Sequence, residues 1–197
     1  MNKSKVGFFG GCFNPPTNVH INLAKKLIED GILDKVIFVP VGDYYEKIDL
    51  VSAQDRYNML KIVCRDYENI DVNDIACSHK DKLFAIDTLK LIYDKYNKMY
   101  DVYFIMGADN FERMPLWKDY KELISKYKFV VIERLKHKEV ESSANIIVYK
   151  NTSLVQDSRM SSTQIRKMIR TGQDVKEYIN KNVLSYIEKH KLYLGND

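Results

Sequence analysis

A histidine, a threonine and two glycines lie close together in the segment GGCFNPPTNVH at residues 10–20, which we call the first motif. Gly10 and Gly11 can adopt backbone angles that are closed to other residues and let the chain approach a ligand closely. Thr17 can cap a helix that starts after it, and the first turn of a helix offers unpaired N–H groups and the positive end of a dipole. His20 falls in that turn, so its ring can reach an anion bound there. The first motif therefore predicts a cradle for a phosphate group.

The middle of the first motif predicts a stiff turn. Asn14, Pro15 and Pro16 shape it, and Asn18 is an alternative to Thr17 as the helix cap. The segment matches neither the G-x-G-x-x-G pattern of dinucleotide-binding proteins nor the G-K-[ST] of a P-loop. The alternative without a ligand is a tight strand-to-helix turn with a histidine on the surface.

Hydroxyl groups gather in a second segment, RMSSTQIR at residues 159–166, which we call the second motif. Ser161, Ser162 and Thr163 stand where the pattern predicts the start of a helix, and Arg166 follows one turn later. Hydroxyls, free N–H groups and an arginine at a helix start predict a second anion site. The alternative is a simple serine cap beside a surface arginine.

The segments that must position both motifs alternate between strand-like and helix-like patterns. Continuous apolar runs predict strands over residues 5–9, 35–40, 101–106, 128–133 and 145–150. Apolar residues at helical spacing predict helices over residues 18–30, 53–67 and 85–96, and only helices from Ser161 onwards. Gly31 is expected to stop the first helix and Gly172 the helix of the second motif.

This alternation predicts an α/β fold with a doubly wound, mostly parallel sheet, helices on both faces and a small C-terminal helical annex. We expect one domain over residues 1–197, with residues 161–197 as its helical part beside the carboxyl ends of the strands. Ligands of such sheets bind at that edge, where the first motif also lies. In the second predicted helix, the spacing places Tyr57, Leu60 and Cys64 on one face, flanked by Met59 and Val63.

Composition argues against several classes of protein. The 197 residues contain no apolar run of 18, so a membrane span is not expected. The net charge of +4 is spread over interleaved lysines and acids, without the basic patch typical of a nucleic-acid binder. Three scattered cysteines without a secretion signal predict free thiols and a cytoplasmic location. Cys77 and His79 could form half of a zinc site, but no second pair follows at ligand spacing.

The two motifs together resemble a nucleotidyltransferase superfamily. The first is similar to its pattern G-G-x-F-D-P-x-[HT]-x-G-H, with Thr17 at the [HT] position and His20 at the final His. The second is similar to its pattern I-S-S-T-x-I-R. The resemblance implies a Rossmann-like fold. The first motif departs from the pattern at Asn14, where Asp is usual, and at Val19, where Gly is usual.

Further likeness points to the nicotinate-nucleotide adenylyltransferases and extends over nearly the whole chain. The stretch 104–134 resembles their G-x-D-N segment, tryptophan and strand-ending arginine through Gly107, Asp109, Asn110, Trp117 and Arg134. The resemblance implies that Asp109 accepts hydrogen bonds from a ribose hydroxyl and that the Trp117 ring faces a pyridine ring. A tryptophan that only packs helix against sheet is the alternative.

The resemblance also implies an acceptor site, although several of its residues differ from the family. Residues 83–92 resemble the S-Y-T-x-D-T-L segment, but Phe84 replaces its tyrosine and Ala85 its threonine. Residues 43–47 keep only the lysine of a Pro-Pro-His-Lys element. Backbone N–H groups around Phe84 and Ala85 are then expected to hold the nicotinate carboxylate. The implied acceptor-binding residues are Lys47, Phe84, Ala85, Trp117 and Arg134.

The reaction that the resemblance implies is in-line attack of a nucleotide phosphate on the α-phosphorus of ATP, with pyrophosphate leaving. Alignment and charge neutralisation matter most in such transfers. The implied catalytic residues are His20, Thr17 and Arg166, with His20 donating to the attacked phosphate. The implied ATP-binding residues are Gly10, Gly11, Cys12, Phe13, His20, Gly107, Asp109, Ser162, Thr163 and Arg166. Mg²⁺ is expected to arrive with ATP, to keep several of its water ligands and to need few protein carboxylates.

The expected partners are ATP and nicotinate mononucleotide, with neither nucleic acid nor membrane, and a homo-oligomer is left open. One alternative is an enzyme of the same fold that acts on nicotinamide mononucleotide or phosphopantetheine. Another is a nucleotide-binding regulator that has lost turnover. The joint presence of His20, Thr163 and Arg166 argues against the regulator.

Overall fold

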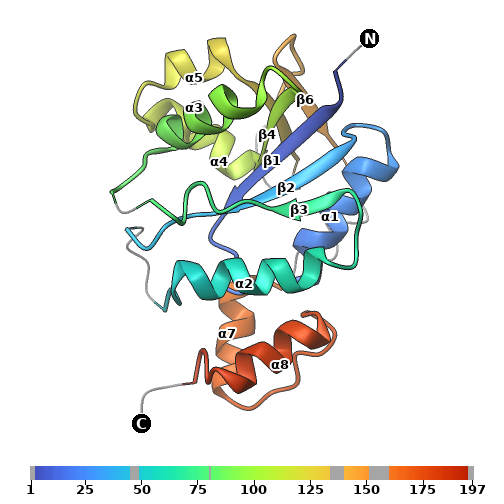
Figure 1. Ribbon diagram of the computed structural model, residues 1–197, viewed down its shortest axis with the longest axis vertical. Helices are drawn as coiled ribbons and strands as arrows, with labels where there is room; N and C mark the ends of the chain where they lie inside the picture. The colour runs from blue at the N-terminus through green and yellow to red at the C-terminus, as the bar shows by residue number, and fades with distance from the viewer. Residues whose placement is uncertain (1–2, 45–48, 80, 134–139, 151–159, 195–197) are drawn as a thin grey trace.

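A six-stranded sheet forms the centre of the computed structural model, which describes residues 3–44, 49–79, 81–133, 140–150 and 160–194 (Figure 1). In chain order the elements are β1 (Lys5–Gly11), α1 (Asn18–Glu29), β2 (Lys35–Pro40), α2 (Ala53–Cys64), β3 (Ile70–Val72), α3 (Ala85–Tyr96), β4 (Asp101–Gly107), α4 (Ala108–Arg113), the 3₁₀ helix η1 (Met114–Leu116), α5 (Tyr120–Lys126), β5 (Lys128–Ile132), β6 (Ile146–Tyr149), α7 (Ser162–Arg170) and α8 (Lys181–Lys189).

The strand order is β3-β2-β1-β4-β5-β6, and each pair of neighbours is parallel. The chain builds outwards from β1 to β2 and β3, and then returns to add β4 on the other side of β1. The order therefore reverses between β1 and β4, and ligands of doubly wound sheets bind outside the carboxyl ends of the strands at such a point. The first motif begins at the carboxyl end of β1. The fold predicted from the sequence is confirmed.

Helices cover both faces of the sheet, because each central strand is apolar on both sides. In β4, the side chains of Tyr103 and Ile105 join one buried cluster, while those of Val102, Phe104 and Met106 join the other. The first cluster includes residues of α1, α2, α7 and α8, and the second includes residues of α3 and α5. Figure 1 shows α1 and α2 on one side of the sheet and α3 to α5 on the other.

Most element boundaries agree with the sequence to within two residues, and the expected glycine stops are present. Gly31 follows α1 with a φ of +68°, and Gly172 follows α7 with a φ of +69°. In both turns the glycine amide donates to a carbonyl three residues earlier. The strand β3 was not predicted. The helix predicted to reach residue 67 ends at Cys64, because the chain turns there and the Tyr67 amide donates to the Cys64 carbonyl.

The face of α2 that the sequence predicts is mostly buried. Leu60 and Cys64 are buried, but Tyr57 is only half-buried. Its neighbour Arg56 is fully buried instead, with no exposed surface. An arginine can occupy such a position because its guanidinium group donates to three oxygens there.

The C-terminal helices lie beside the carboxyl edge of the sheet, as expected. Helix α8 packs against α2, where the Tyr186 hydroxyl donates to Asp55 Oδ1 at 2.9 Å and accepts from Asn58 Nδ2 at 3.1 Å. The side chains of Val183 and Ile187 complete the buried cluster on this face. Among the described residues, no helix combines the length and the apolar character that a membrane crossing requires.

Candidate active site

The first motif brings Thr17 and His20 together at the start of α1. The Thr17 N–H donates to His20 Nδ1 at 3.0 Å, and Thr17 Oγ1 lies 2.9 Å from the same nitrogen. Because a backbone N–H can only donate, Nδ1 is an acceptor, and a neutral His20 ring then holds its proton on Nε2. The Phe13 ring meets the imidazole edge to face, with 5.2 Å between centroids. These contacts fix the tautomer that the predicted donor role of His20 requires.

The loop after β1, residues 12–17, is held mainly through its carbonyl groups. The Cys12 carbonyl accepts from Arg56 at 3.1 Å, and the Asn14 carbonyl accepts from Arg166 at 2.9 Å. Two neighbouring carbonyls also have donors. The Val41 amide donates to the Gly11 carbonyl and the Ser162 hydroxyl to the Pro15 carbonyl, both at 3.0 Å. The protein therefore binds this loop from its carbonyl side.

The amide groups of Cys12 and Phe13 remain on the other side of the loop. In a trans peptide the N–H points away from the carbonyl that precedes it, so holding the Gly11 and Cys12 carbonyls turns these two amides outwards. Within the described part of the chain neither amide has a protein acceptor. Gly11 permits this close turn, because a Cβ there would lie 2.9 Å from the Phe13 ring. Two neighbouring outward amides are suited to binding phosphate oxygens.

The two motifs, far apart in sequence, meet on this loop. Ser161 caps α7 through its hydroxyl, which accepts from the Gln164 amide at 3.3 Å. Ser162 then donates to the Pro15 carbonyl, 147 positions away in the chain. Arg166 lies one turn further, is 5% exposed, and also reaches Thr163 Oγ1 at 3.5 Å. The second motif is therefore packed against the first, as a shared site requires.

Three donors near the predicted site have hydrogen-bond partners within the protein. The Asn18 amide at the start of α1 donates to the Tyr178 carbonyl at 2.8 Å. The Phe84 amide donates to Asp87 Oδ2 at 2.9 Å in the cap of α3, so it is not available for a carboxylate. The Ser162 hydroxyl, which was expected to help to hold pyrophosphate, donates to the Pro15 carbonyl. The roles proposed for Thr163 and Arg166 on pyrophosphate stay predictions.

The remaining predicted residues that the structure describes include Gly107, Asp109, Trp117 and Gly10. Gly107 ends β4 and caps α4, and Asp109 stands in the first turn of that helix. Trp117 is half-buried and packs against the cluster on the α3 and α5 face, so part of its ring has the packing role given as the alternative. Gly10 is exposed, with open space beside it. Lys47 and Arg134 lie outside the described residues.

Phe84 and Ala85 mark the start of α3. The Phe84 ring is 45% exposed, which is unusual for an aromatic side chain. Lys82 Nζ lies 5.6 Å and Lys118 Nζ 5.1 Å from the ring centroid, so two cations lie against one apolar ring. Ala85 is half-buried as the first residue of the helix. This corner of the site therefore offers an aromatic face surrounded by positive charge.

Two functional positions were missed by the sequence analysis, Arg56 and Tyr193. The Tyr193 hydroxyl donates to Asn14 Oδ1 at 2.8 Å, and the same oxygen accepts from the Val51 amide at 3.3 Å. Asn14 Nδ2 donates to the Asp49 carbonyl at 2.7 Å. An amide satisfies all three bonds at once, whereas a carboxylate could not donate to Asp49. These contacts account for asparagine where the superfamily pattern has aspartate.

Replacing Tyr193 with phenylalanine is expected to lower the free energy of unfolding by about 1 kcal/mol at neutral pH, the usual contribution of one such bond. Burial raises the pKa of the Tyr193 hydroxyl above its ordinary value of 10.0. The native state then holds this proton more tightly than the unfolded state, so the contribution is complete below about pH 10 and is lost as the pH rises further. Urea unfolding from pH 8 to 11 checks this: the variant should lose stability less steeply than the parent, and equal slopes would contradict it.

The cysteines are all free thiols, as predicted. Burial, with a contribution from the Asp71 carboxylate, raises the pKa of Cys64 to about 12, so this thiol is not reactive near neutral pH. Cys77 and His79 are described, and the described part of the chain contains no cluster of three or more potential metal ligands. The predicted half of a zinc site thus has no described partners.

Replacing Cys12 with serine is expected to leave most of kcat intact. Cys12 contributes its backbone N–H and carbonyl to the loop. Serine keeps both backbone groups and has a side chain of similar size. Steady-state turnover of the variant checks this. A loss of about tenfold or more, which is about 1.4 kcal/mol of barrier, would instead give the thiol a part in the reaction.

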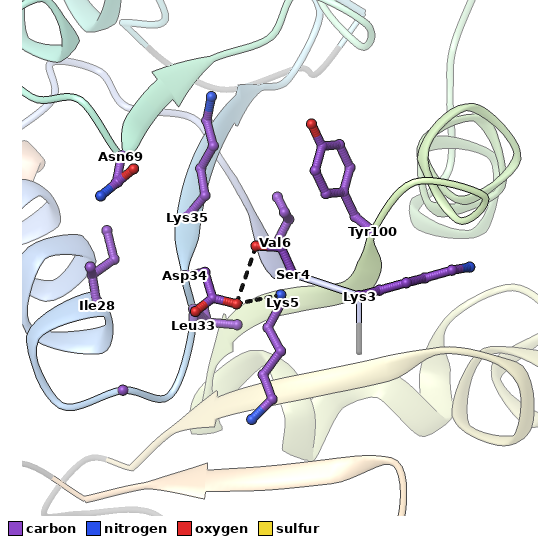
Figure 2. A pocket seen from close by; sticks show the side chains of 11 residues that line it. Lys3, Ser4, Lys5, Val6, Ile28, Leu33, Asp34, Lys35, Asn69 and Tyr100 are labelled. Carbon is purple, nitrogen blue, oxygen red and sulfur yellow. Dashed lines mark hydrogen bonds between the residues drawn. The ribbon is translucent and has the colours of Figure 1, made fainter. Parts of the chain in front are cut away.

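A second hollow lies at the opposite edge of the sheet, at the amino ends of β1 and β2. It measures about 770 Å³ and includes Lys3, Lys5, Asp34 and Lys35 in its lining. Figure 2 shows the three lysine side chains pointing in different directions. Lys3 donates to the Asn97 carbonyl and Lys35 to Asp71, while Asp34 accepts from the Lys5 amide. The charges do not converge on one point, so this hollow is not a competing active site.

The chain is similar to known proteins over nearly its whole length. The sequence model of the cytidylyltransferase-like family matches residues 8–168. A protein of Acholeplasma laidlawii named "probable nicotinate-nucleotide adenylyltransferase" is 32% identical over 94% of this chain and 95% of its own. One of the same name from Clostridium tetani is 31% identical over 96% and 98%. The structure of Plasmodium falciparum nicotinic acid mononucleotide adenylyltransferase complexed with NaAD superposes with a TM-score of 0.81 at 24% identity, covering 96% of this chain and 97% of that one.

Proposed function

We propose that this chain, which belongs to the cytidylyltransferase-like family and, within it, to the nicotinate-nucleotide adenylyltransferases, transfers AMP from ATP to nicotinate mononucleotide. The products are nicotinate adenine dinucleotide and pyrophosphate, a step of NAD biosynthesis. We assign the site to one nucleotidyltransferase domain over residues 1–197. The observation that carries the proposal is the junction of the two motifs, where Ser162 and Arg166 bind the loop that presents the Cys12 and Phe13 amides.

The chemistry assigned to the site follows from its donors. The acceptor's phosphate oxygen attacks the α-phosphorus of ATP in line, the new P–O bond forms as the bond to the β-phosphate oxygen breaks, and pyrophosphate departs with the electron pair. His20 Nε2–H donates to the attacked phosphate, where negative charge grows in the transition state. The Cys12 and Phe13 amides hold the same phosphate region, and Thr17 keeps the His20 ring in position.

Mg²⁺ accompanies ATP in this proposal, and the described residues fit a metal held mainly by the nucleotide. None of them form a cluster of three or more acidic, histidine or cysteine ligands, and the loop itself offers amides rather than carboxylates. When bound, the ion would neutralise phosphate charge and keep most of its water ligands. Alignment is left to the protein through the Cys12 and Phe13 amides and His20.

The test is pyrophosphate release by the purified protein with ATP and Mg²⁺, comparing nicotinate mononucleotide with nicotinamide mononucleotide and phosphopantetheine. Fast release with the first acceptor alone supports the proposal and shows that Ala85 permits recognition of the nicotinate carboxylate. Release only with another acceptor would keep the reaction type and overturn the substrate. No release with any acceptor, together with tight ATP binding, would favour the regulator instead.

A further inference from the structure

Arg56 on α2 is the largest fully buried side chain of the described chain, with 0% of its surface exposed. It donates from all three nitrogens of its guanidinium group to three different segments: Nε to the Val51 carbonyl at 3.0 Å, one terminal nitrogen to the Cys12 carbonyl at 3.1 Å, and the other to Asp43 Oδ1 at 3.4 Å. One side chain thus joins the loop after β1, the segment after β2 and the start of α2.

The buried charge of Arg56 is only partly neutralised. Its one carboxylate partner among the described residues is Asp43, whose side chain is 64% exposed and whose attraction water screens. The other two acceptors are neutral carbonyls. Burying a charge is costly unless it is paired and hydrogen-bonded, so a solely structural role would be served equally well by apolar packing. The presence of a buried guanidinium group here therefore indicates a role for Arg56 other than packing.

The reason lies in the peptide between Cys12 and Phe13. Because that peptide is planar, holding the Cys12 carbonyl towards Arg56 turns the Phe13 N–H to the opposite side, where the phosphate is bound in our proposed function. Phe13 has a φ of +48°, a backbone conformation that side-chain-bearing residues rarely adopt, so this orientation needs support. We propose that Arg56 is a positioning residue of the phosphate site, which acts by orienting the Phe13 amide; this proposal rests on the proposed function.

Arg166 provides a parallel, two residues further along the same loop. It holds the Asn14 carbonyl from the side of α7, whereas Arg56 holds the Cys12 carbonyl from the side of α2. Both arginines are buried and both donate to carbonyls of the loop rather than reach out of it. Two guanidinium groups from two different helices thus hold the loop, and only Arg166 belongs to one of the two motifs.

The experiment compares Arg56→Lys with the matched control Arg65→Lys, an exposed arginine just after the same helix. Lysine keeps the charge but offers one ammonium group in place of the planar fork, so it cannot hold three oxygens in this geometry. We expect R56K to fold, to bind ATP several-fold more weakly and to lose about tenfold or more in kcat, since small displacements of a donor are costly to catalysis. The acceptor's KM should change little, and R65K should match the parent in every respect.

A further variant separates orientation from stability. In Arg56→Ala, added guanidinium at low millimolar concentration should restore part of kcat, whereas the same addition should not affect R65K. If R56K keeps parental kcat and ATP affinity, or if its loss disappears once turnover is divided by the folded fraction, the proposal is wrong. Should the parent itself turn over no acceptor, the proposed function fails separately, and the ATP affinities of R56K and R65K decide the role of Arg56.

Discussion

Replacing His20 with alanine is expected to lower kcat by about 10²-fold or more, the scale of losing one preorganised donor in a site of this kind. The Thr17 amide donates to Nδ1, so the proton of the neutral ring is on Nε2, and the same bond holds the ring in its orientation. Alanine removes the donor but leaves the loop, whose bonds to Arg56 and Arg166 do not involve His20. The KM of both substrates should therefore change less than kcat.

Steady-state kinetics with the control His190→Ala measures this effect. His190 is exposed at the end of α8, where it stacks on Tyr186 at 4.1 Å between ring centroids. The control should keep the parental kcat. A near-normal kcat for the His20 variant would remove the assigned donor role and would leave the backbone amides of the loop as the main source of rate enhancement.

Replacing Arg166 with methionine is expected to have the second largest effect, on both stability and turnover. The Asn14 carbonyl would lose its donor in a buried place, which should lower the free energy of unfolding by about 2 to 3 kcal/mol. Among the described residues Nε of Arg166 has no hydrogen-bond partner. That nitrogen is buried, so it offers no contact to a ligand. The family resemblance assigns Arg166 to holding pyrophosphate, so the variant should also bind pyrophosphate less tightly.

The control for this prediction is Arg170→Met on the same helix. Arg170 makes an ion pair with Asp49 at 3.1 Å in which both side chains are 40% exposed or more, so its loss should cost less than about 1 kcal/mol. Urea unfolding and calorimetric titration with pyrophosphate give the two readouts. Unchanged pyrophosphate affinity in a folded Arg166 variant would restrict this arginine to holding the loop, in agreement with its burial.

The fold was predictable because its strands are long apolar runs and its helices have clear apolar spacing. The strand β3 was missed because it has three residues, of which only Ile70 is buried, and so gives no period. The burial of Arg56 on α2 was also missed, because a periodic pattern of apolar residues predicts that a charged side chain faces solvent. Arg56 is buried in spite of its charge, through contacts to residues up to 44 positions away that no local pattern encodes.

The site was predictable to the level of its motifs, but not to the level of its individual hydrogen bonds. The pattern of the first motif indicated Thr17 and His20, and the cap before α7 indicated where the second motif starts. The partner of the Asn18 amide is a carbonyl about 160 positions later, at Tyr178. The contact of Tyr193 with Asn14 likewise exists only in the folded chain. Which donors remain for a ligand depends on such long-range contacts, so it cannot be derived from spacing.

The connection of the first motif to the last described helices has a consequence for biosynthesis. Two of the bonds that hold Asn14 come from Arg166 and Tyr193, which are 152 and 179 positions further along the chain. At about 5 to 20 residues per second, a ribosome adds Tyr193 roughly 9 to 36 s after Asn14. The sheet can assemble during that interval, but the loop that presents the Cys12 and Phe13 amides lacks its fixed shape until translation has passed α8. A chain that stops before Tyr193 is therefore expected to lack the two bonds that hold Asn14, and with them the fixed shape of the nucleotide cradle.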